Sequence, residues 1–327
     1  MPPSITDHWP RKSGQLIADL LKRSARLNLE AVGFVRDTAD VHELPENITL
    51  PVLGTIHELH QLTEKHQIDE IVVAITSELT PDVFHQLVDC QGLGVQVSWM
   101  ADLYEKLGRS IPVQYVEPTW ALCALQGQPI FSRLQMASKR LVDLFFVLLA
   151  LPLLAPLMAV VALLIKLDSK GPIFYQQVRV GRGGKLYTIY KFRTMVPDAE
   201  RQGEAKWAAD NDPRITKIGR ILRKARVDEL PQLFNILTGE MSLVGPRPER
   251  PEFVTILQDN IPYYRTRLLV KPGLTGWAQI HYDYAGSVEE ALYKLQYDFY
   301  YVRYWSLWLD LYTIFKTVFV VFKLKGK

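Results

Sequence analysis

The segment Leu144–Ile165 reads LFFVLLALPLLAPLMAVVALLI and contains no charged or polar side chain over 22 residues. An apolar run longer than about 18 residues is typical of a membrane segment. Pro152 and Pro156 lie near its middle, where each proline removes an amide donor and obstructs the preceding helical turn. The segment therefore predicts a membrane helix that is broken at its centre.

The charges that flank this segment predict how it enters the membrane. Lys139 and Arg140 precede it, and Lys166 and Lys170 follow it. Lysine and arginine beside a membrane segment favour the cytoplasmic side. If both ends are cytoplasmic, the chain must enter the bilayer and return, which a proline-broken re-entrant helix over about residues 141–167 can do. A kinked single span and a buried core helix are the alternatives.

The charge distribution divides the 327 residues into two parts near Ser138. Residues 1–137 carry a net charge of −7 and residues 138–327 a net charge of +10. With 48% hydrophobic and 22% charged residues, the composition excludes a mainly disordered chain. Two cysteines, Cys90 and Cys123, are too few for a disulfide scaffold or a cysteine-rich metal site. We expect an N-terminal domain over residues 1–137 and a membrane-anchored domain over residues 138–327.

Short apolar runs alternate with helical stretches in the acidic N-terminal half. The expected strands are Leu29–Val35, Ile68–Ile75 and Val95–Trp99, and the expected helices are Ile56–Lys65 and Pro81–Cys90. This alternation favours a small parallel, Rossmann-like α/β sheet. A dinucleotide site needs a glycine-rich turn after the first strand, whereas Gly54 stands alone there. We therefore expect a structural or regulatory role. Met1–Arg26 lacks the long apolar core of a secretion signal, so we expect a cytoplasmic location.

Aromatic residues recur with helical spacing in the C-terminal stretch. They are Trp305, Trp308, Tyr312, Phe315, Phe319 and Phe322, which would share one face of a helix. Asp310 and Lys316 interrupt the run, so the helix should not span a bilayer. We expect an amphipathic helix in the membrane interface, with the terminal lysines near the headgroups. Packing in a protein core is the alternative.

An expected β-hairpin covers Pro172–Thr194, and cations crowd the basic half from the end of this hairpin onward. They are Lys191, Arg193, Arg214, Lys217, Arg220, Arg223, Lys224 and Arg226. Arginine suits phosphate because its planar fork can donate two hydrogen bonds. The sequence shows no recognised nucleic-acid motif, and the membrane segment favours a phosphate-bearing lipid or a nucleotide as the partner. Lys191, Arg193 and Arg214 are candidate substrate cations.

Asp228-Glu229-Leu230-Pro231 lies inside this crowd of cations. In one interpretation it begins a helix, with Asp228 as the N-cap and the proline in the first turn. In the other, the adjacent carboxylates hold Mg²⁺ and supply a nucleophile, because carboxylates can form acyl-phosphate intermediates. The two interpretations are compatible.

Four ordered blocks carry a resemblance to a known family. They are Val178–Gly181 with Tyr190–Met195; Asp212–Thr216 through Gly219-Arg220, Leu222-Arg223 and Asp228–Asn235; Gly239–Pro248; and Lys271–Trp277. In this order they resemble the bacterial sugar transferase family, the monotopic polyprenyl-phosphate hexose-1-phosphate transferases. The resemblance runs from about Ser138 to the C-terminus. The acidic half resembles, more weakly, the Rossmann-like module of longer members, and we expect a truncated form of it.

The resemblance implies a reaction and a site. The family transfers a sugar 1-phosphate from a UDP-sugar to undecaprenyl phosphate and releases UMP, the first step of exopolysaccharide, capsule or O-antigen assembly. It implies that Asp228 is the nucleophile, that Glu229 binds Mg²⁺, that Arg223 binds phosphate and that Arg247 lies at the nucleotide. It also implies a re-entrant helix on the cytoplasmic face of the bacterial inner membrane, which agrees with the charge argument above.

Some features depart from the family pattern or stay open. A serine commonly precedes the helix-breaking proline in the family, whereas Ala155 precedes Pro156 here. A non-catalytic membrane adaptor is the alternative function, and an NAD-dependent nucleotide-sugar enzyme is a third that the missing glycine-rich turn disfavours. The sugar stays open among glucose, galactose and N-acetylated or modified hexoses. The oligomeric state also stays open, with a homodimer as one arrangement.

Overall fold

The computed structural model describes residues 13–23, 29–37, 50–75, 79–126, 132–196, 212–282 and 287–322. The chain divides into two compact units, Met1–Ala124 and Leu125–Lys327. The boundary expected at Ser138 lies inside helix α6 (Arg133–Asp168), because the basic composition begins only after the helix has started. Each unit is described by itself below.

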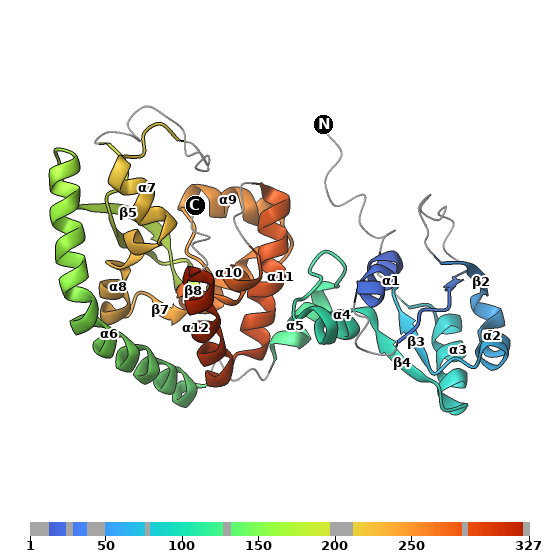
Figure 1. Ribbon diagram of the computed structural model, residues 1–327. Helices are drawn as coiled ribbons and strands as arrows, with labels where there is room; N and C mark the ends of the chain where they lie inside the picture. Colours follow the sequence, from blue (N-terminus) through green and yellow to red (C-terminus); the bar gives the residue numbers. More distant parts are fainter. Residues whose placement is uncertain are drawn as a thin grey trace. The chain divides into compact units, whose positions relative to one another are not determined.

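The first unit is a small α/β module (Figure 1). Its elements are α1 (Ser13–Arg23), β1 (Phe34–Arg36), β2 (Val52–Thr55), η3 (Ile56–Glu58), α2 (Leu59–His66), β3 (Glu70–Val73), α3 (Pro81–Gly92), β4 (Gln96–Trp99) and α4 (Met100–Gly108). β1 pairs with β2 and β3 pairs with β4, both in parallel. The β3–β4 pair, with α3 between its strands, agrees with the predicted parallel alternation, but the described strands form two separate two-stranded sheets in place of one. The sequence analysis missed β2, a short strand that contains Gly54. α5 (Pro118–Leu125) follows this module.

Local sequence explains how α3 begins and which face it buries. The Thr80 hydroxyl accepts a hydrogen bond from the Val83 amide at 3.4 Å, and a proline occupies the first turn. Val83, Leu87 and Cys90 recur at helical spacing and are buried against the core that includes Val73 of β3. Each fully buried side chain of this size contributes roughly 1.5–3 kcal/mol.

The carboxylate of Glu58 caps the start of the helical segment that follows β2. Glu58 Oε2 accepts hydrogen bonds from the Thr55 amide at 2.8 Å and from the Thr55 hydroxyl at 3.1 Å. In dinucleotide-binding folds this helix start receives the phosphates. Here a protein carboxylate takes the position, which agrees with the lack of a glycine-rich turn.

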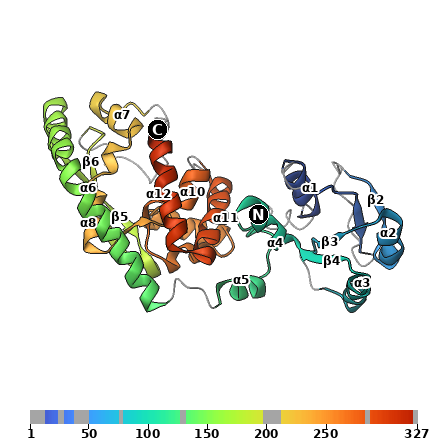
Figure 2. The ribbon, with the colours of Figure 1, turned by 60° about the horizontal axis from the view of Figure 1, so that its bottom comes forward.

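The second unit combines a long helix, a β-hairpin and a helical layer (Figure 2). Its elements are α6, β5 (Phe174–Val180), η5 (Arg182–Gly184), β6 (Leu186–Phe192), α7 (Lys217–Lys224), η6 (Val227–Glu229), α8 (Gln232–Thr238), β7 (Ser242–Val244), α9 (Pro251–Asn260), η7 (Tyr264–Leu269), β8 (Gly273–Thr275), α10 (Trp277–His281), α11 (Val288–Tyr304) and α12 (Leu307–Phe322). β5 and β6 form the expected antiparallel hairpin, and β7 and β8 pair in parallel.

α6 is one continuous helix of 36 residues that contains both Pro152 and Pro156. Figure 1 shows that it changes direction about half-way along, which is where prolines bend a helix. Its N-terminal half packs through Val147 against α8, and its C-terminal half packs through Ile165 against the end of β6 and α7. The central side chains are exposed and apolar, and the helix is long and apolar enough to cross a membrane. The structure thus has a bent helix where the sequence predicted a break.

The charges that precede the apolar stretch hold α6 to the rest of the unit. The Lys139 ammonium lies 2.7 Å from Asp310 Oδ2 of α12. Arg140 donates hydrogen bonds to the last carbonyls of α8, where a cation stabilises a helix end. Asp143 accepts hydrogen bonds from the Ser242 hydroxyl and the following amide, each at 3.0 Å. These residues therefore anchor the helix as well as flank it.

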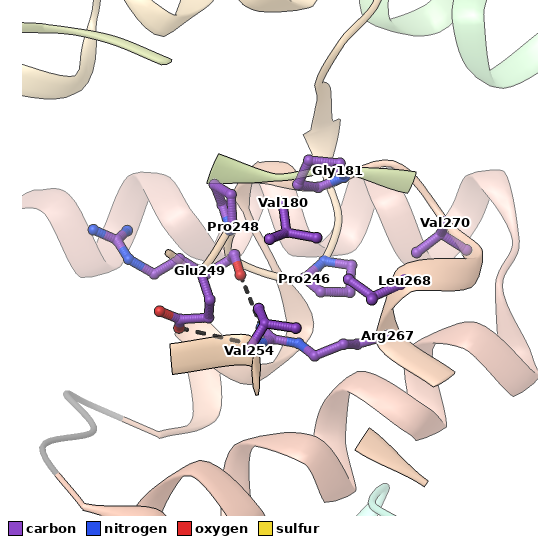
Figure 3. Close-up of a pocket in the computed structure, with 11 residues that line it drawn as sticks. Val180, Gly181, Pro246, Pro248, Glu249, Val254, Arg267, Leu268 and Val270 are labelled. Atoms are coloured by element: carbon purple, nitrogen blue, oxygen red, sulfur yellow. Dashed lines mark hydrogen bonds and ion pairs between the residues drawn. The ribbon is translucent and has the colours of Figure 1, made fainter. Parts of the chain in front are cut away.

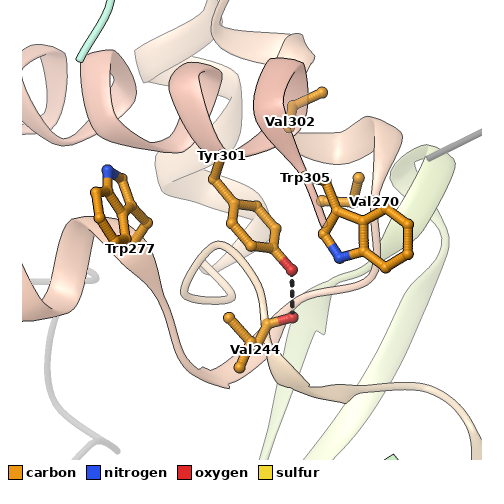
Figure 4. Packing of buried hydrophobic residues seen from close by; sticks show 6 residues of the cluster. All are labelled: Val244, Val270, Trp277, Tyr301, Val302 and Trp305. Atoms are coloured by element: carbon orange, nitrogen blue, oxygen red, sulfur yellow. Dashed lines mark hydrogen bonds between the residues drawn. The ribbon is translucent and has the colours of Figure 1, made fainter. Parts of the chain in front are cut away.

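A buried aromatic cluster forms the centre of the helical layer (Figure 4). Its members are Val244, Val270, Trp277, Tyr301, Val302 and Trp305. The Tyr301 hydroxyl lies 3.0 Å from the Val244 carbonyl and 2.8 Å from Asp310 Oδ1. Trp305 lies in the connection between α11 and α12 and is buried, so the expected aromatic face is wrong at this residue. Protein side chains of this cluster, rather than lipid, therefore surround Trp305.

Candidate active site

The predicted carboxylates lie in a short turn between two helices. Arg226 lies between α7 and η6 and adopts a left-handed backbone conformation with φ of 56°. Asp228 and Glu229 follow in η6. Both carboxylate residues are buried. The N-cap of α8 is Pro231, and neither carboxylate caps a helix. The interpretation of Asp228 as a helix N-cap is therefore wrong, and its side chain is left for another role.

Glu229 is held between two cations. Its Oε1 lies 2.8 Å from the Lys191 ammonium of β6 and 2.7 Å from Arg247 Nη2. Burial alone would raise the pKa of Glu229, but the charges of Arg247 and Lys191 outweigh it and hold this pKa well below its ordinary value. In return, the Glu229 charge raises the pKa of Arg247. Glu229 is therefore ionised and fixed in place at neutral pH.

Asp228 lies in a different environment from its neighbour. Its carboxylate has no hydrogen bond or ion pair with any residue in the described parts of the chain. Burial, together with the adjacent Glu229 charge, raises its pKa to about 6, although nearby cations act in the opposite direction. Adjacent carboxylates with opposite pKa shifts mark different chemical roles. Glu229 forms ion pairs with Lys191 and Arg247, whereas the Asp228 carboxylate is without a partner in the described parts of the chain.

Arg223 extends from α7 toward the start of the segment after β6. Its Nε donates a hydrogen bond to the Thr194 hydroxyl at 2.9 Å. Gly219 allows this arrangement because a Cβ there would collide with the Thr194 carbonyl. The Thr216 amide also donates to that carbonyl, at 3.0 Å. Among the described residues, the two Nη atoms of Arg223 have no partner, so their donors can serve an anionic substrate.

Two of the candidate substrate cations are occupied elsewhere. Arg193 is buried and donates from Nη2 to the carbonyl and hydroxyl of Ser169, both at 2.8 Å, at the C-terminal end of α6. Arg214 forms an ion pair with Asp212 at 2.5 Å. Of the three candidates, the structure brings only Lys191 into contact with the carboxylate pair. Arg193 contacts Ser169 through Nη2 alone, and its Nε and Nη1 atoms are buried without a hydrogen-bond partner among the described residues.

The turn that carries Arg247 is supported from behind by the buried Arg267 and the half-buried Arg179. Arg267 donates to the Arg247 carbonyl at 2.8 Å, and Arg179 donates to the Pro248 carbonyl at 3.1 Å. Figure 3 shows Arg267 and Glu249 pointing toward one another, and their ion pair measures 3.9 Å. The cavity beside the turn has a volume of about 10 Å³, enough for one water at most. It is a packing gap, and the turn itself is rigid.

Some supporting residues were missed by the sequence analysis. Asn235 is fully buried, and it accepts from the Tyr190 amide at 3.2 Å and donates to the Thr188 carbonyl at 2.7 Å. It therefore ties α8 to the strand that carries Lys191. Lys294 of α11 lies within electrostatic range of Arg247, and burial lowers its pKa to about 8, with the Arg247 charge adding to the effect. Asn235 ends the motif block Asp228–Asn235, but the spacing of residues in that block does not indicate which of them is a buried hydrogen-bonding residue.

The residues at the site suit a magnesium ion. In the described parts of the chain, no three His, Cys, Asp or Glu side chains gather as a closed metal site. Mg²⁺ is usually held by one or two carboxylates together with substrate phosphates and water. Asp228 and Glu229 supply carboxylate oxygens of this kind, and Arg223 supplies donors for phosphate. The donor set therefore fits an ion that binds together with its substrate.

Two family profiles and several curated proteins match the chain. The sequence profile described as "Bacterial sugar transferase" matches residues 134–324, and the profile described as "CoA-binding domain" matches residues 11–101. The chain is 40% identical over 232 residues to a protein of Aeromonas hydrophila named "UDP-N-acetylgalactosamine-undecaprenyl-phosphate N-acetylgalactosaminephosphotransferase". It is 38% identical over 274 residues to an "Undecaprenyl-phosphate glucose phosphotransferase" of Komagataeibacter xylinus. It is 32% identical over 298 residues to a "UDP-glucose:undecaprenyl-phosphate glucose-1-phosphate transferase" of Xanthomonas campestris pv. campestris.

These alignments cover 71%, 81% and 90% of this chain and 53%, 51% and 61% of the respective relatives. The chain thus spans about half the length of the curated relatives that it matches. The sugar transferase profile covers more than half of the chain and includes the carboxylate pair, Arg223 and Arg247. The chain belongs to the bacterial sugar transferase family.

Proposed function

We propose that the chain transfers a sugar 1-phosphate from a UDP-sugar to undecaprenyl phosphate, with release of UMP. The observation that carries this proposal is the contrast between two adjacent buried carboxylates. Glu229 forms ion pairs with Lys191 and Arg247, whereas Asp228 has no partner among the described residues. A carboxylate kept free beside a fixed positive potential is suited to attack the phosphorus of an anionic diphosphate.

The reaction proceeds in two balanced steps. An oxygen of Asp228 attacks the phosphorus that carries the sugar, and a bond from this oxygen to phosphorus forms. The bond from that phosphorus to the UMP phosphate breaks, and UMP leaves with the electron pair. An oxygen of undecaprenyl phosphate then attacks the same phosphorus, and the bond to Asp228 breaks, which restores the carboxylate. The products are UMP and an undecaprenyl-diphosphate sugar.

The surrounding side chains hold charge where these steps need it. Arg223 offers two Nη donors to a phosphate, and Arg247 is fixed by Glu229 beside the nucleophile. Glu229, with the substrate phosphates, would hold Mg²⁺. Such an ion would supply positive charge to neutralise the diphosphate. Lys191 completes the positive potential from β6.

We also propose that α6 enters and leaves the bilayer on the cytoplasmic side of the bacterial inner membrane. Both halves of the helix pack against the same unit, and Arg193 ties the last turn of α6 to the end of β6. A straight span would carry Ser169 away from these contacts. The bent form keeps the carboxylate pair near the membrane surface, where a lipid phosphate and a soluble nucleotide can both reach it.

UMP release tests the reaction. The full chain in lipid nanodiscs is supplied with Mg²⁺, undecaprenyl phosphate and one UDP-sugar at a time. We expect release with at least one donor, and loss of release in Asp228→Asn but not in the exposed control Asp259→Asn. With the acceptor omitted, a donor labelled at the sugar-bearing phosphorus should label the protein and should fail to label Asp228→Asn. Full activity of Asp228→Asn would disprove this role, and inactivity with every donor would favour the membrane adaptor.

Cysteine labelling tests the path of α6. Leu134→Cys and Lys170→Cys place thiols at exposed positions on either side of the apolar stretch, in a Cys123→Ser background. Cys90 is buried and should not react. An impermeant maleimide should label neither site from the outside of spheroplasts and both sites after the membrane is opened. Labelling of one site from each side would show a single span.

A further inference from the structure

α12 differs in polarity from a typical helix on the surface of a soluble protein. In a soluble protein, the apolar face of a surface helix turns inward and the polar face meets water. Among the side chains of α12 that the structure describes, the most deeply buried are Asp310, at 2% exposure, and Thr313, at 0%. The side of this helix that faces the protein thus carries these two polar residues together with Tyr312 and Ile314, which pack partly buried against the aromatic cluster.

Specific contacts hold the polar side in place. Asp310 binds the Lys139 ammonium at 2.7 Å and accepts a hydrogen bond from the Trp305 indole at 3.0 Å. Thr317 lies one turn after Thr313, and its hydroxyl is 2.7 Å from the Thr275 hydroxyl of β8. These contacts fix the rotation of the helix about its axis. The side chains on the opposite face are therefore held outward.

The outward face consists of large apolar side chains. Trp308 is 76% exposed, Phe315 60% and Phe319 51%. Leu311 and Val318 fill the positions between them and are also exposed. The spacing of three and four residues makes this a continuous stripe along the helix. A soluble surface rarely exposes a contiguous apolar patch of this kind without a partner.

We infer that the outward face of α12, defined by Trp308, Leu311, Phe315, Val318 and Phe319, is a second bilayer contact, embedded among lipid acyl chains. Three observations favour lipid over a second copy of the chain. The polar-inside arrangement suits an apolar solvent. The Lys139–Asp310 pair joins the start of α12 to the start of the membrane helix α6, so the two apolar surfaces belong to one rigid part.

The third observation is the charge next to the stripe. Lys316 lies on α12 with its ammonium 5.6 Å from the centre of the Tyr312 ring, and Lys323, Lys325 and Lys327 follow in the sequence. Lysines beside an apolar helix face are attracted to anionic headgroups, each by about 1 kcal/mol. A second copy would place the same lysines against each other if it packed symmetrically. The positive charge of these lysines therefore favours an anionic lipid surface over a second copy of the chain as the partner of the stripe.

Spin labels test this inference without any need for turnover. Trp308→Cys, Phe315→Cys and Phe319→Cys are each made in the Cys123→Ser chain, labelled with a nitroxide and placed in nanodiscs that contain anionic lipid. The matched control is Ile256→Cys on α9, another exposed apolar position of the same unit. The readout compares collisions with oxygen, which concentrates in the bilayer, and with a water-soluble nickel chelate.

We expect oxygen collisions to exceed nickel collisions at the three α12 sites and the ratio to reverse at the control site. Nickel access at the α12 sites equal to that at the control would overturn the inference, because the stripe would then face water. Dipolar broadening between labels on different chains, with low access to both reagents, would also overturn it and would assign the stripe to a second copy. An inactive preparation would not affect either result, so failure here is separate from failure of the proposed reaction.

Discussion

Replacing Asp310 with leucine should destabilise the second unit because it leaves a charge without its partner. Asp310 is almost fully buried, and the Lys139 side chain beside it is only 12% exposed. In the Asp310→Leu protein, the Lys139 ammonium keeps the Val244 carbonyl and the Tyr301 hydroxyl as neighbours but loses its counter-charge. Breaking a buried ion pair from one side costs about 3–5 kcal/mol.

The expected loss can be measured as a melting temperature. For a unit of this size, each kcal/mol corresponds to about 2–4 °C, so the Asp310→Leu protein should melt roughly 6–20 °C lower. The assay is tryptophan fluorescence on heating of the full chain in nanodiscs. The exposed control Asp259→Leu should change the melting temperature by about 2 °C or less, because surface substitutions stay within about 0.5 kcal/mol.

A double variant separates the ion pair from simple loss of packing. Lys139→Met with Asp310→Leu removes both charges, and such replacements are often neutral or stabilising. The Trp305 indole would still lack its acceptor, at a cost of about 1–3 kcal/mol. We therefore expect the double variant to melt above Asp310→Leu and to recover part of the lost melting temperature. If it melts as low as Asp310→Leu alone, an unpaired lysine is not the cause and the reasoning fails.

Three further predictions concern the site. Glu229→Gln should lower UMP release at least about 100-fold while leaving the melting temperature within a few degrees, because a fixed charge near developing charge is worth this much; unchanged release would contradict it. The pKa of Lys294 is lowered to about 8, so its charge near Arg247, for which we propose contact with the nucleotide, is present at pH 7 and lost at pH 9. The KM for the UDP-sugar should therefore rise over this range, and Lys294→Arg, which stays charged, should flatten the rise. A Cβ at Gly245 would lie 2.9 Å from the Gly273 amide nitrogen, so Gly245→Ala should lower the free energy of unfolding by about 1–3 kcal/mol. Gly92 has open space around it, so Gly92→Ala should cost less than about 0.5 kcal/mol in the same melting assay.

Much of the fold was predictable where periodicity is local. The strands at residues 70–73 and 96–99 and the helix Pro81–Gly92 agree with the predictions, because alternation and helix caps are written in neighbouring residues. The strand Val52–Thr55 was missed, since four residues with a glycine give little pattern. The bend of α6 in place of a break was also not predictable. Its outcome depends on contacts at both ends of the helix, which come from distant parts of the chain.

The site divides in a similar way. The motif blocks located Asp228 and Glu229, but only the structure separates the residue that holds cations from the one that is free. The crowd of cations could not be sorted from sequence. Arg193 and Lys191 are two residues apart on a strand end, yet one reaches the end of α6 and the other reaches Glu229. Tertiary contacts separate the roles of these two residues, and the spacing of residues in the sequence does not predict such contacts.

The Lys139–Asp310 pair also has a consequence for biosynthesis. The two residues are separated by 171 positions in the chain. At 5–20 residues per second, a ribosome needs roughly 10–35 s to pass from one to the other. During that interval α6 has already emerged, with its lysine exposed and its apolar surface uncovered. The nascent protein therefore depends on the bilayer or on a chaperone to shelter α6 until α12 arrives and closes the unit.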